Sequence, residues 1–183
     1  PRETDAVPGA SVPPTAHVHE WTVAGGLVEN ADGLLMVRNV RHGGEVDWTP
    51  PGGVIDADDA SLAAGLTREV VEETGLTVGR WDGPIYRVRA EAPDLGWLMH
   101  CEVHYALEFD GDLRLDDPDG IVVAAEFLDD AGCSEVLASC ARWVREPLEA
   151  WMSDRWTVRE AREFHYEVRG ARLEDLQVHR LDP

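Results

Sequence analysis

The stretch that decides the fold is PPGGVIDADDASLAAGLTREVVEETGL, which runs from Pro50 to Leu76. Its second half predicts a helix that carries Glu69, Glu72 and Glu73 at positions i, i+3 and i+4. Because side chains with this spacing share one face of a helix, we expect the three carboxylates to lie side by side.

The same stretch has the apolar repeat and the stop signal of an amphipathic helix. Leu62, Leu66 and Val70 recur every four residues on another face, which is typical of a helix packed on a core. Gly75 is suited to end the helix in a left-handed turn. A loop with two adjacent glycines leads into this segment.

An acidic helix face has two explanations. Most such faces are only solvated, and like charges at these spacings cost roughly 0.2–0.5 kcal/mol per pair. A hard divalent cation such as Mg²⁺ relieves that repulsion, because it takes oxygen ligands from carboxylates and substrate phosphates. Arg68 is the only strong base nearby.

The whole stretch resembles the Nudix box of the Nudix hydrolases, which reads Gly, five residues, Glu, seven residues, then Arg-Glu-apolar-any-Glu-Glu-any-Gly-apolar. Gly53 is the opening glycine, and Arg68 to Leu76 matches the second half at every defined position. Asp59 stands where the family has Glu, and eight residues separate it from Arg68. Because the apolar repeat runs unbroken into Val70, we expect the extra residue in the loop before the helix.

The resemblance implies an α/β fold, in which a mixed β-sheet is sandwiched between helices. It also implies hydrolysis of the diphosphate linkage in a nucleoside diphosphate joined to another moiety, with Mg²⁺ or alternatively Mn²⁺ as cofactor. In that reading Glu69, Glu72, Glu73 and the backbone of Gly53 bind the metal. Glu72 or Glu73, or an acid of a later loop, activates water, and Arg68 orients a glutamate of the helix.

Two other functions remain open at this point. The chain can be a non-catalytic Nudix-fold module that binds a nucleotide-like ligand, an alternative that the altered spacing at Asp59 permits. It can also be a globular protein with a chance acidic helix. The substrate is equally open, because ADP-ribose, nucleotide sugars and nucleoside triphosphates all fit the motif.

Composition narrows the class of protein. The chain has 183 residues, 44% of them hydrophobic, and a formal net charge of −20. This acidity argues against binding a nucleic-acid polymer or an anionic membrane, since both are held by basic patches. Three cysteines without a CxxC pair do not form a disulfide framework. We expect a flexible N-terminal arm over residues 1–16, a single domain over 17–183, and a cytoplasmic protein without a signal peptide.

Alternating patterns and turns predict the remaining elements. We expect a hairpin of Glu20 to Glu29 with Leu34 to Val40, a strand from Leu76 to Val88 broken at Asp82-Gly83-Pro84, and a strand from Leu98 to Phe109. Ser134 to Trp151 predicts a helical region interrupted near Pro147. Segments 164–168 and 173–178 predict an extra C-terminal hairpin, which would cover a sheet edge or join the partner of a homodimer.

Further site residues are predicted outside the box. The acidic loop from Asp110 to Gly120 and the strand after it contain candidates for an additional acid, which are Asp117, Asp119 and Glu126. The candidates for substrate binding are Trp48, Arg87 and Arg89, which are suited to stack on a base or hold phosphate. His100, Glu102 and His104 share one strand face, predicted to be a polar face that lines the substrate cleft, with a transition-metal site as the alternative.

Overall fold

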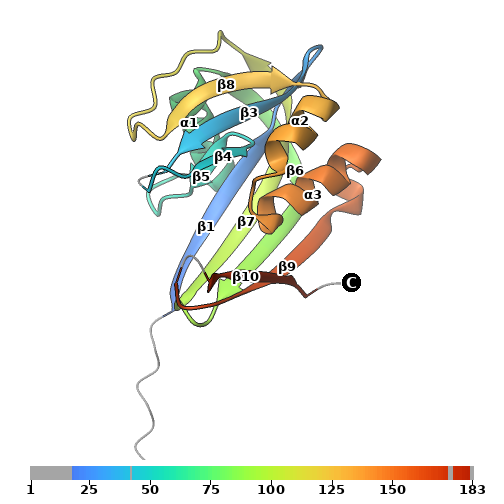
Figure 1. The fold of residues 1–183 in the computed structure, drawn as a ribbon. Coiled ribbons are helices and arrows are strands. Elements are labelled where there is room, and N and C mark those ends of the chain that lie inside the picture. The colour runs from blue at the N-terminus through green and yellow to red at the C-terminus, as the bar shows by residue number, and fades with distance from the viewer. Residues whose placement is uncertain (1–17, 42, 173–174, 182–183) are drawn as a thin grey trace, which may run out of the picture.

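The structure is a computed structural model that describes residues 18–41, 43–172 and 175–181 (Figure 1). The N-terminal arm predicted over residues 1–16 lies outside these residues. The strands are β1 His19–Leu27, β2 Glu29–Asn30, β3 Gly33–Val40, β4 Val46–Thr49, β5 Gly52–Val54, β6 Thr77–Ala92, β7 Trp97–Asp110, β8 Val122–Leu128, β9 Arg162–Arg169 and β10 Gln177–Arg180. The helices are α1 Leu62–Thr74, α2 Asp130–Leu137 and α3 Arg142–Asp154, and η1 Val158–Glu160 is a short 3-10 turn.

The strands form two sheets. The larger has the order β10-β9-β6-β7-β1-β5 and is mixed, because β1 runs parallel to β7 and β6 runs parallel to β9. The smaller is built on β3, which pairs with β2, β4 and β8. β5, which carries the paired glycines, is the edge strand of the larger sheet beside β1, and residues 55–61 connect it to α1.

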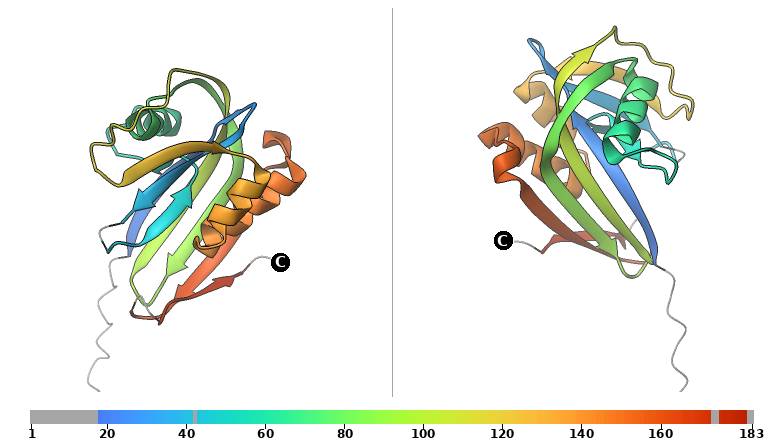
Figure 2. Two further views of the ribbon diagram at one scale, coloured as in Figure 1. Left: turned by 45° about the horizontal axis from the view of Figure 1, so that its top comes forward. Right: turned by 180° about the vertical axis from the view of Figure 1, so that it is seen from behind.

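Helices cover the strands from two sides, as both views of Figure 2 show. Leu66 and Val70 of α1 are fully buried against Ala24 and Leu35. On the other side, α2 and α3 bury large side chains such as Leu148 in a second cluster. The predicted α/β architecture, with a mixed sheet between helices, is confirmed.

The hairpin predicted for residues 20–40 is wrong for most of its length. β1 pairs with β5 and β7, and only the two residues of β2 pair with the start of β3. The turn itself is present, because the N–H groups of Asp32 and Gly33 donate to Oδ1 of Asn30. A local turn fixes the pairing of its nearest residues, whereas the partner of β1 lies some eighty residues further along the chain, where no local pattern identifies it.

The predicted helical break near Pro147 is also wrong. The chain leaves the helical conformation between α2 and α3, where Sγ of Cys140 donates to the carbonyl of Trp48 at 3.2 Å and accepts its N–H at 3.4 Å. Pro147 lies inside α3 and is buried. Packing of this helix on the core therefore offsets a proline that costs about 3 kcal/mol in an isolated helix.

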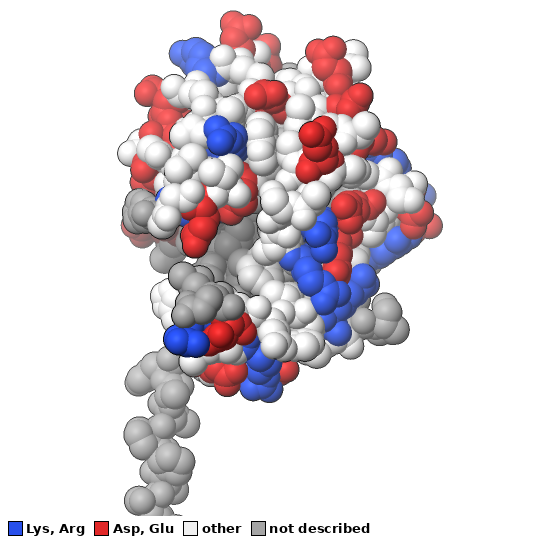
Figure 3. Space-filling view, in the orientation of Figure 1, with Lys and Arg blue, Asp and Glu red and all other residues white. Residues whose placement is uncertain are grey.

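The remaining strand predictions hold in outline. β7 covers the predicted 98–109 strand, but the break predicted at Asp82-Gly83-Pro84 is wrong, because β6 continues through these residues with only a shift of register against β7. β9 and β10 form the predicted C-terminal hairpin, with Val168 opposite Val178. None of the described helices is long and apolar enough to cross a membrane. In Figure 3, basic side chains gather near α3 and this hairpin, while acidic ones are spread over the rest of the visible face.

Candidate functional site

α1 forms as its sequence predicts and has a cap at each end. Oγ of Ser61 accepts the N–H of Ala64 at 3.1 Å, so one of the free amides of the first turn is satisfied. Gly75 has a φ of 76° and its N–H reaches the carbonyl of Val71, which is the left-handed stop. The helix is regular from Leu62 onward, so the extra residue of the box lies before it.

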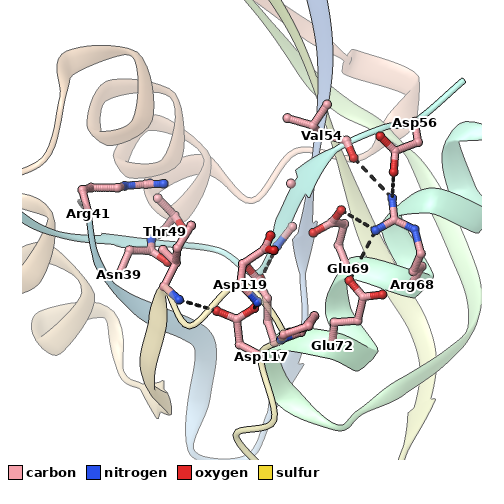
Figure 4. Close-up of a pocket in the computed structure, with 15 residues that line it drawn as sticks. Asn39, Arg41, Thr49, Val54, Asp56, Arg68, Glu69, Glu72, Asp117 and Asp119 are labelled. Atoms are coloured by element: carbon pink, nitrogen blue, oxygen red, sulfur yellow. Dashed lines mark hydrogen bonds and ion pairs between the residues drawn. The ribbon is translucent and has the colours of Figure 1, made fainter.

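Arg68 is the centre of an ion-pair network at the start of the acidic face (Figure 4). Its Nη2 lies 2.9 Å from Oδ2 of Asp59 and 3.4 Å from Oδ2 of Asp56, and its Nη1 lies 2.6 Å from Oε1 of Glu69. The same Nη1 reaches Oε2 of Glu72 at 3.3 Å. Arg68 thus joins the loop before the helix to two glutamates of the helix.

Asp59 retains its contact with Arg68 although the spacing differs from the family pattern. Both of its carboxylate oxygens accept hydrogen bonds from the guanidinium, from Nε at 3.2 Å and from Nη2 at 2.9 Å. These bonds from Arg68 hold the pKa of Asp59 below its usual range. The shorter side chain reaches Arg68 because α1 carries the close-packed Gly65, where a Cβ would overlap the Asp59 carboxylate.

Glu73 is held differently from the other two glutamates. Its Oε2 accepts the N–H of Gly52 at 2.8 Å. Burial raises the pKa of Glu73 to about 8, with the negative charges of Glu69 and Asp117 adding to the effect and the Gly52 hydrogen bond opposing it. Burial therefore favours the protonated form of Glu73 in the protein without a bound cation.

A cavity of about 420 Å³, here called the acidic cavity, lies between α1, β5 and the loop before β8. Six carboxylates line it: Asp56, Glu69, Glu72, Glu73, Asp117 and Asp119. Two arginines line it as well, Arg41 and Arg68. The structure therefore brings the predicted Glu69, Glu72, Glu73, Arg68 and Gly53 to the wall of one cavity, together with two of the three candidate loop acids.

The loop acids have unequal positions. Asp117 uses both carboxylate oxygens to hold its own loop, since Oδ2 accepts the N–H groups of Ile121 and Val122 at 2.7 and 2.8 Å and Oδ1 accepts that of Asp119. Asp119 is exposed and faces Glu69. Burial raises the pKa of Glu69, and the negative charge of Asp119 raises it further. Glu126 lies on β8 opposite Met36, exposed and outside the cavity wall.

The carboxylates suit a hard divalent cation by their chemistry. All the candidate ligands are oxygens, which Mg²⁺ and Mn²⁺ take in preference to nitrogen or sulfur. Among the described residues no three acidic, histidine or cysteine side chains already converge on one point. Glu69 and Glu72 contact Arg68, and Glu73 contacts Gly52, so these partners keep the carboxylates apart.

A second cavity of about 330 Å³, here called the apolar cavity, adjoins the first. Its wall includes the side chains of Trp21, Met99 and Trp143. The sequence alone did not identify these residues or Arg41 as part of a cavity. An apolar side chain in a strand or helix, or an arginine in a polar loop, carries no local sign that it faces a cavity.

The residues predicted to bind substrate lie elsewhere. Arg87 pairs with Glu102 at 2.9 Å and Arg89 with Glu91 at 3.0 Å, and neither lines either cavity. β6 instead directs Tyr86 and Val88 to the apolar cavity. Arg87 and Arg89 point the other way because successive side chains of a strand alternate between faces.

Two further sets of predicted residues also lie outside both cavities. Trp48 packs against the core beneath α2 and lines neither cavity. His100, Glu102 and His104 do not line the cleft, because the apolar cavity is lined by the alternate residues Met99, Cys101 and Val103. His104 instead contacts Glu102 at 3.1 Å, and His100 contacts Glu20 at 3.0 Å.

The family model of the NUDIX domain matches residues 19–138. No curated protein matches the sequence. Among solved structures, the mutator MutT protein from Bacillus halodurans is 20% identical with a TM-score of 0.60, and the match covers 89% of this chain and 99% of that one.

Two other solved structures give similar values. The MutT protein from Methanosarcina mazei Go1 is 20% identical with a TM-score of 0.60, covering 75% of this chain and 96% of that one. A NUDIX hydrolase from Nitrosomonas europaea is 19% identical with a TM-score of 0.59, covering 76% and 93%. At these identities the likeness establishes a shared fold.

Proposed function

Since this chain belongs to the NUDIX domain family, we propose that it hydrolyses the diphosphate linkage of a nucleoside diphosphate joined to another moiety, with Mg²⁺ as its cofactor. Nudix hydrolases use divalent metal ions and act on small nucleotide-like substrates. The substrate classes in question are ADP-ribose, nucleotide sugars and nucleoside triphosphates.

One observation carries the proposal, which is the excess of negative groups around the acidic cavity. Six carboxylates and two arginines line it, and one of the arginines is already surrounded by carboxylates. A diphosphate brought into this cavity by itself would be repelled. A cavity that receives both a divalent cation and a diphosphate resolves the conflict, since the cation neutralises both sets of oxygens.

Different residues would bind the cation, orient the carboxylates that bind it and leave room for them. Glu69 and Glu72 are placed to hold the cation, which would supply charge neutralisation and a coordinated water of lowered pKa. Arg68 orients both glutamates through Nη1. Gly53 leaves room for the Glu69 carboxylate beside the strand, because a Cβ there would occupy the same space.

The more accessible acids are the candidates to accept the proton of the attacking water. A water oxygen attacks phosphorus, the anhydride P–O bond breaks, and the water loses a proton. The Glu72 side chain is 36% exposed and Asp119 is exposed, so either can accept that proton. Glu73, the other predicted base, is less free to do so because its Oε2 accepts the N–H of Gly52.

The test is a screen in which products are identified. The wild-type protein is incubated with ADP-ribose, a nucleotide sugar, nucleoside triphosphates and dinucleoside polyphosphates, in Mg²⁺, in Mn²⁺ and in EDTA. We expect phosphate-containing cleavage products from at least one substrate with metal and none with EDTA. Ligand binding without any cleavage would instead identify the non-catalytic module.

A matched pair of variants assigns the activity to the acidic cavity. Glu72→Gln keeps the size of the side chain and removes its charge, so we expect a loss of at least about 100-fold in turnover with the fold intact. Glu135→Gln, an exposed position on α2 outside both cavities, should behave as wild type. Near-normal kinetics in Glu72→Gln would contradict the assignment.

A further inference from the structure

The two cavities are neighbours that share part of their walls. Arg41, Thr49, Gly52, Gly53 and Val54 line both of them. A ligand longer than one cavity can therefore extend from the acidic cavity into the apolar one across these residues. Among these five residues only Arg41 carries a charge, so its guanidinium lies where the two environments meet.

Arg41 is held in place by a hydrogen-bonded frame. Its Nε and Nη2 donate to the two oxygens of Asp47 at 3.1 and 3.2 Å. Asp47 in turn accepts Nδ2 of the buried Asn39 at 2.8 Å, and the same Nδ2 lies 3.1 Å from Oγ1 of Thr49. This frame occupies one edge of the guanidinium, while the Arg41 side chain remains 45% exposed. Figure 4 shows Arg41, Asn39 and Thr49 on the side of the cavity opposite Arg68.

Arg68, the other arginine of the acidic cavity, already uses its guanidinium to bind acidic side chains of the protein. Its guanidinium contacts Asp59, Glu69 and Glu72, as well as Asp56 and the carbonyl of Val54. Within the described wall of the acidic cavity, Arg41 is consequently the arginine with donors available to a ligand. Guanidinium groups bind phosphate oxygens through short, directional, charge-assisted hydrogen bonds.

The apolar cavity has walls that suit a flat ring. Trp97 packs between the two tryptophans of its wall, with ring centroids 5.6 Å from Trp21 and 6.3 Å from Trp143. This packing restrains both indoles. Nucleobases stack on aromatic side chains, and each stacked base contributes to binding. A sugar would place hydroxyl groups against apolar side chains and leave hydrogen bonds unmade.

We propose that Arg41 binds the phosphate at the junction of the two cavities, and that the apolar cavity binds the base of the same nucleotide against Trp21 and Trp143. The inference rests on the proposed function, because it assigns to one substrate the two cavities that this function would use. The nucleoside end enters the apolar cavity, and the diphosphate to be cleaved lies in the acidic cavity. The group on the far side of the diphosphate has no place in the apolar cavity.

The test uses two probes that differ only in the nucleoside. Adenosine 5′-(α,β-methylene)diphosphate and methylenediphosphonate both contain the non-hydrolysable P–C–P unit, and only the first carries a base. Calorimetry in Mg²⁺ measures the binding of each, independently of turnover. For the wild-type protein we expect the nucleoside probe to bind at least about tenfold tighter, which corresponds to one base stacked on an aromatic side chain.

The variants should separate the two contacts. Arg41→Gln should weaken both probes by a similar factor, about tenfold, because both present a phosphonate to the guanidinium. Trp21→Leu should weaken the nucleoside probe alone and remove its advantage over methylenediphosphonate. Trp143→Leu, on a different element, should do the same, so a folding defect in one tryptophan variant leaves the other as the test. Arg80→Gln is the control, since Arg80 is 63% exposed and pairs with Glu108 away from both cavities.

The outcomes distinguish this inference from the proposed function. Equal binding of the two probes by wild type, unchanged binding in Arg41→Gln, or equal losses for both probes in the tryptophan variants would overturn the inference. None of these results depends on catalysis. If the expected binding pattern is found while the substrate screen yields no cleavage, the inference stands and the hydrolase proposal fails.

Discussion

Gly53 and Glu69 fit together so closely that no side chain can be added to the glycine without moving the carboxylate. A Cβ built on Gly53 would overlap Oε2 and Cδ of Glu69. Gly53 does not have a positive φ, so its lack of a side chain serves the contact with Glu69 and not the backbone conformation. The strand thus fixes the position of one of the candidate metal ligands.

Replacing Gly53 with alanine should reduce activity and leave the fold intact. The new methyl group displaces the flexible end of Glu69, and a carboxylate moved by about 1 Å costs on the order of 100-fold in kcat/KM. Gly79→Ala is the control, because a Cβ there meets its nearest atom at an ordinary 3.8 Å. Steady-state kinetics and thermal melting measure both effects, and unchanged kinetics in Gly53→Ala would contradict a role for the Glu69 position.

Replacing Asp59 with asparagine should weaken the hold on Arg68. The amide removes the negative charge and one of the two oxygens that accept hydrogen bonds from the guanidinium. Losing such an orienting partner costs about 10- to 100-fold in activity or metal affinity. Titration of activity against Mg²⁺ concentration provides the measurement. Asp58→Asn, an exposed change in the same turn, should have no effect. If both variants behave alike, the one-residue departure from the family spacing has left Asp59 without a function.

Glu73 should make the stability of the metal-free protein fall as pH rises. Burial raises its pKa from 4.5 to about 8, so between these values the folded state binds a proton that the unfolded state has lost. The contribution is fully present below pH 4.5 and disappears as pH rises through about 8. Denaturant unfolding in EDTA should show a slope of at most about 1.4 kcal/mol per pH unit relative to Glu73→Gln. Parallel stability curves for the two proteins would show that Glu73 is charged at neutral pH.

The two loop acids should respond differently to the same change. Asp117→Asn removes the charge and replaces one of the two oxygens that together accept three backbone N–H groups with an NH₂ donor, so we expect a loss of about 1–3 kcal/mol in stability. Asp119→Asn leaves those bonds in place and should mainly raise the Mg²⁺ concentration needed for activity. Denaturant unfolding and metal titration of each variant separate the effects. A stability loss confined to Asp119→Asn would reverse these roles.

The sequence alone predicted what depends on local spacing. The helix from Leu62 to Thr74, its stop at Gly75 and the shared face of its glutamates follow from a period of 3.6 residues and from capping chemistry, and the structure contains them. The C-terminal hairpin was also predictable, because turn residues and alternation are local properties.

The wrong predictions concern contacts between segments that are far apart in the sequence. Alternation along β6 places Arg87 and Tyr86 on opposite faces of the sheet, but it does not identify the face that meets the cavity. Register shifts earlier in β6 also change which face the side chains at its two ends occupy. Arg41 lies just after β3 and is positioned by Asp47 of β4, six residues further along the chain. Trp21 and Trp143 line one cavity only because β1 and α3 are brought together by the complete sheet.

The family match ends at residue 138, whereas one wall of the apolar cavity is built by Trp143 and Val144 of α3. The carboxylates of the acidic cavity all lie within the matched residues. The rest of the apolar cavity wall also lies within the match, so α3 adds two residues outside the family match to a cavity that the matched residues otherwise build. If the base binds as proposed, substitutions at Trp143 and Val144 should change the preferred ring while the carboxylates of the acidic cavity keep their positions.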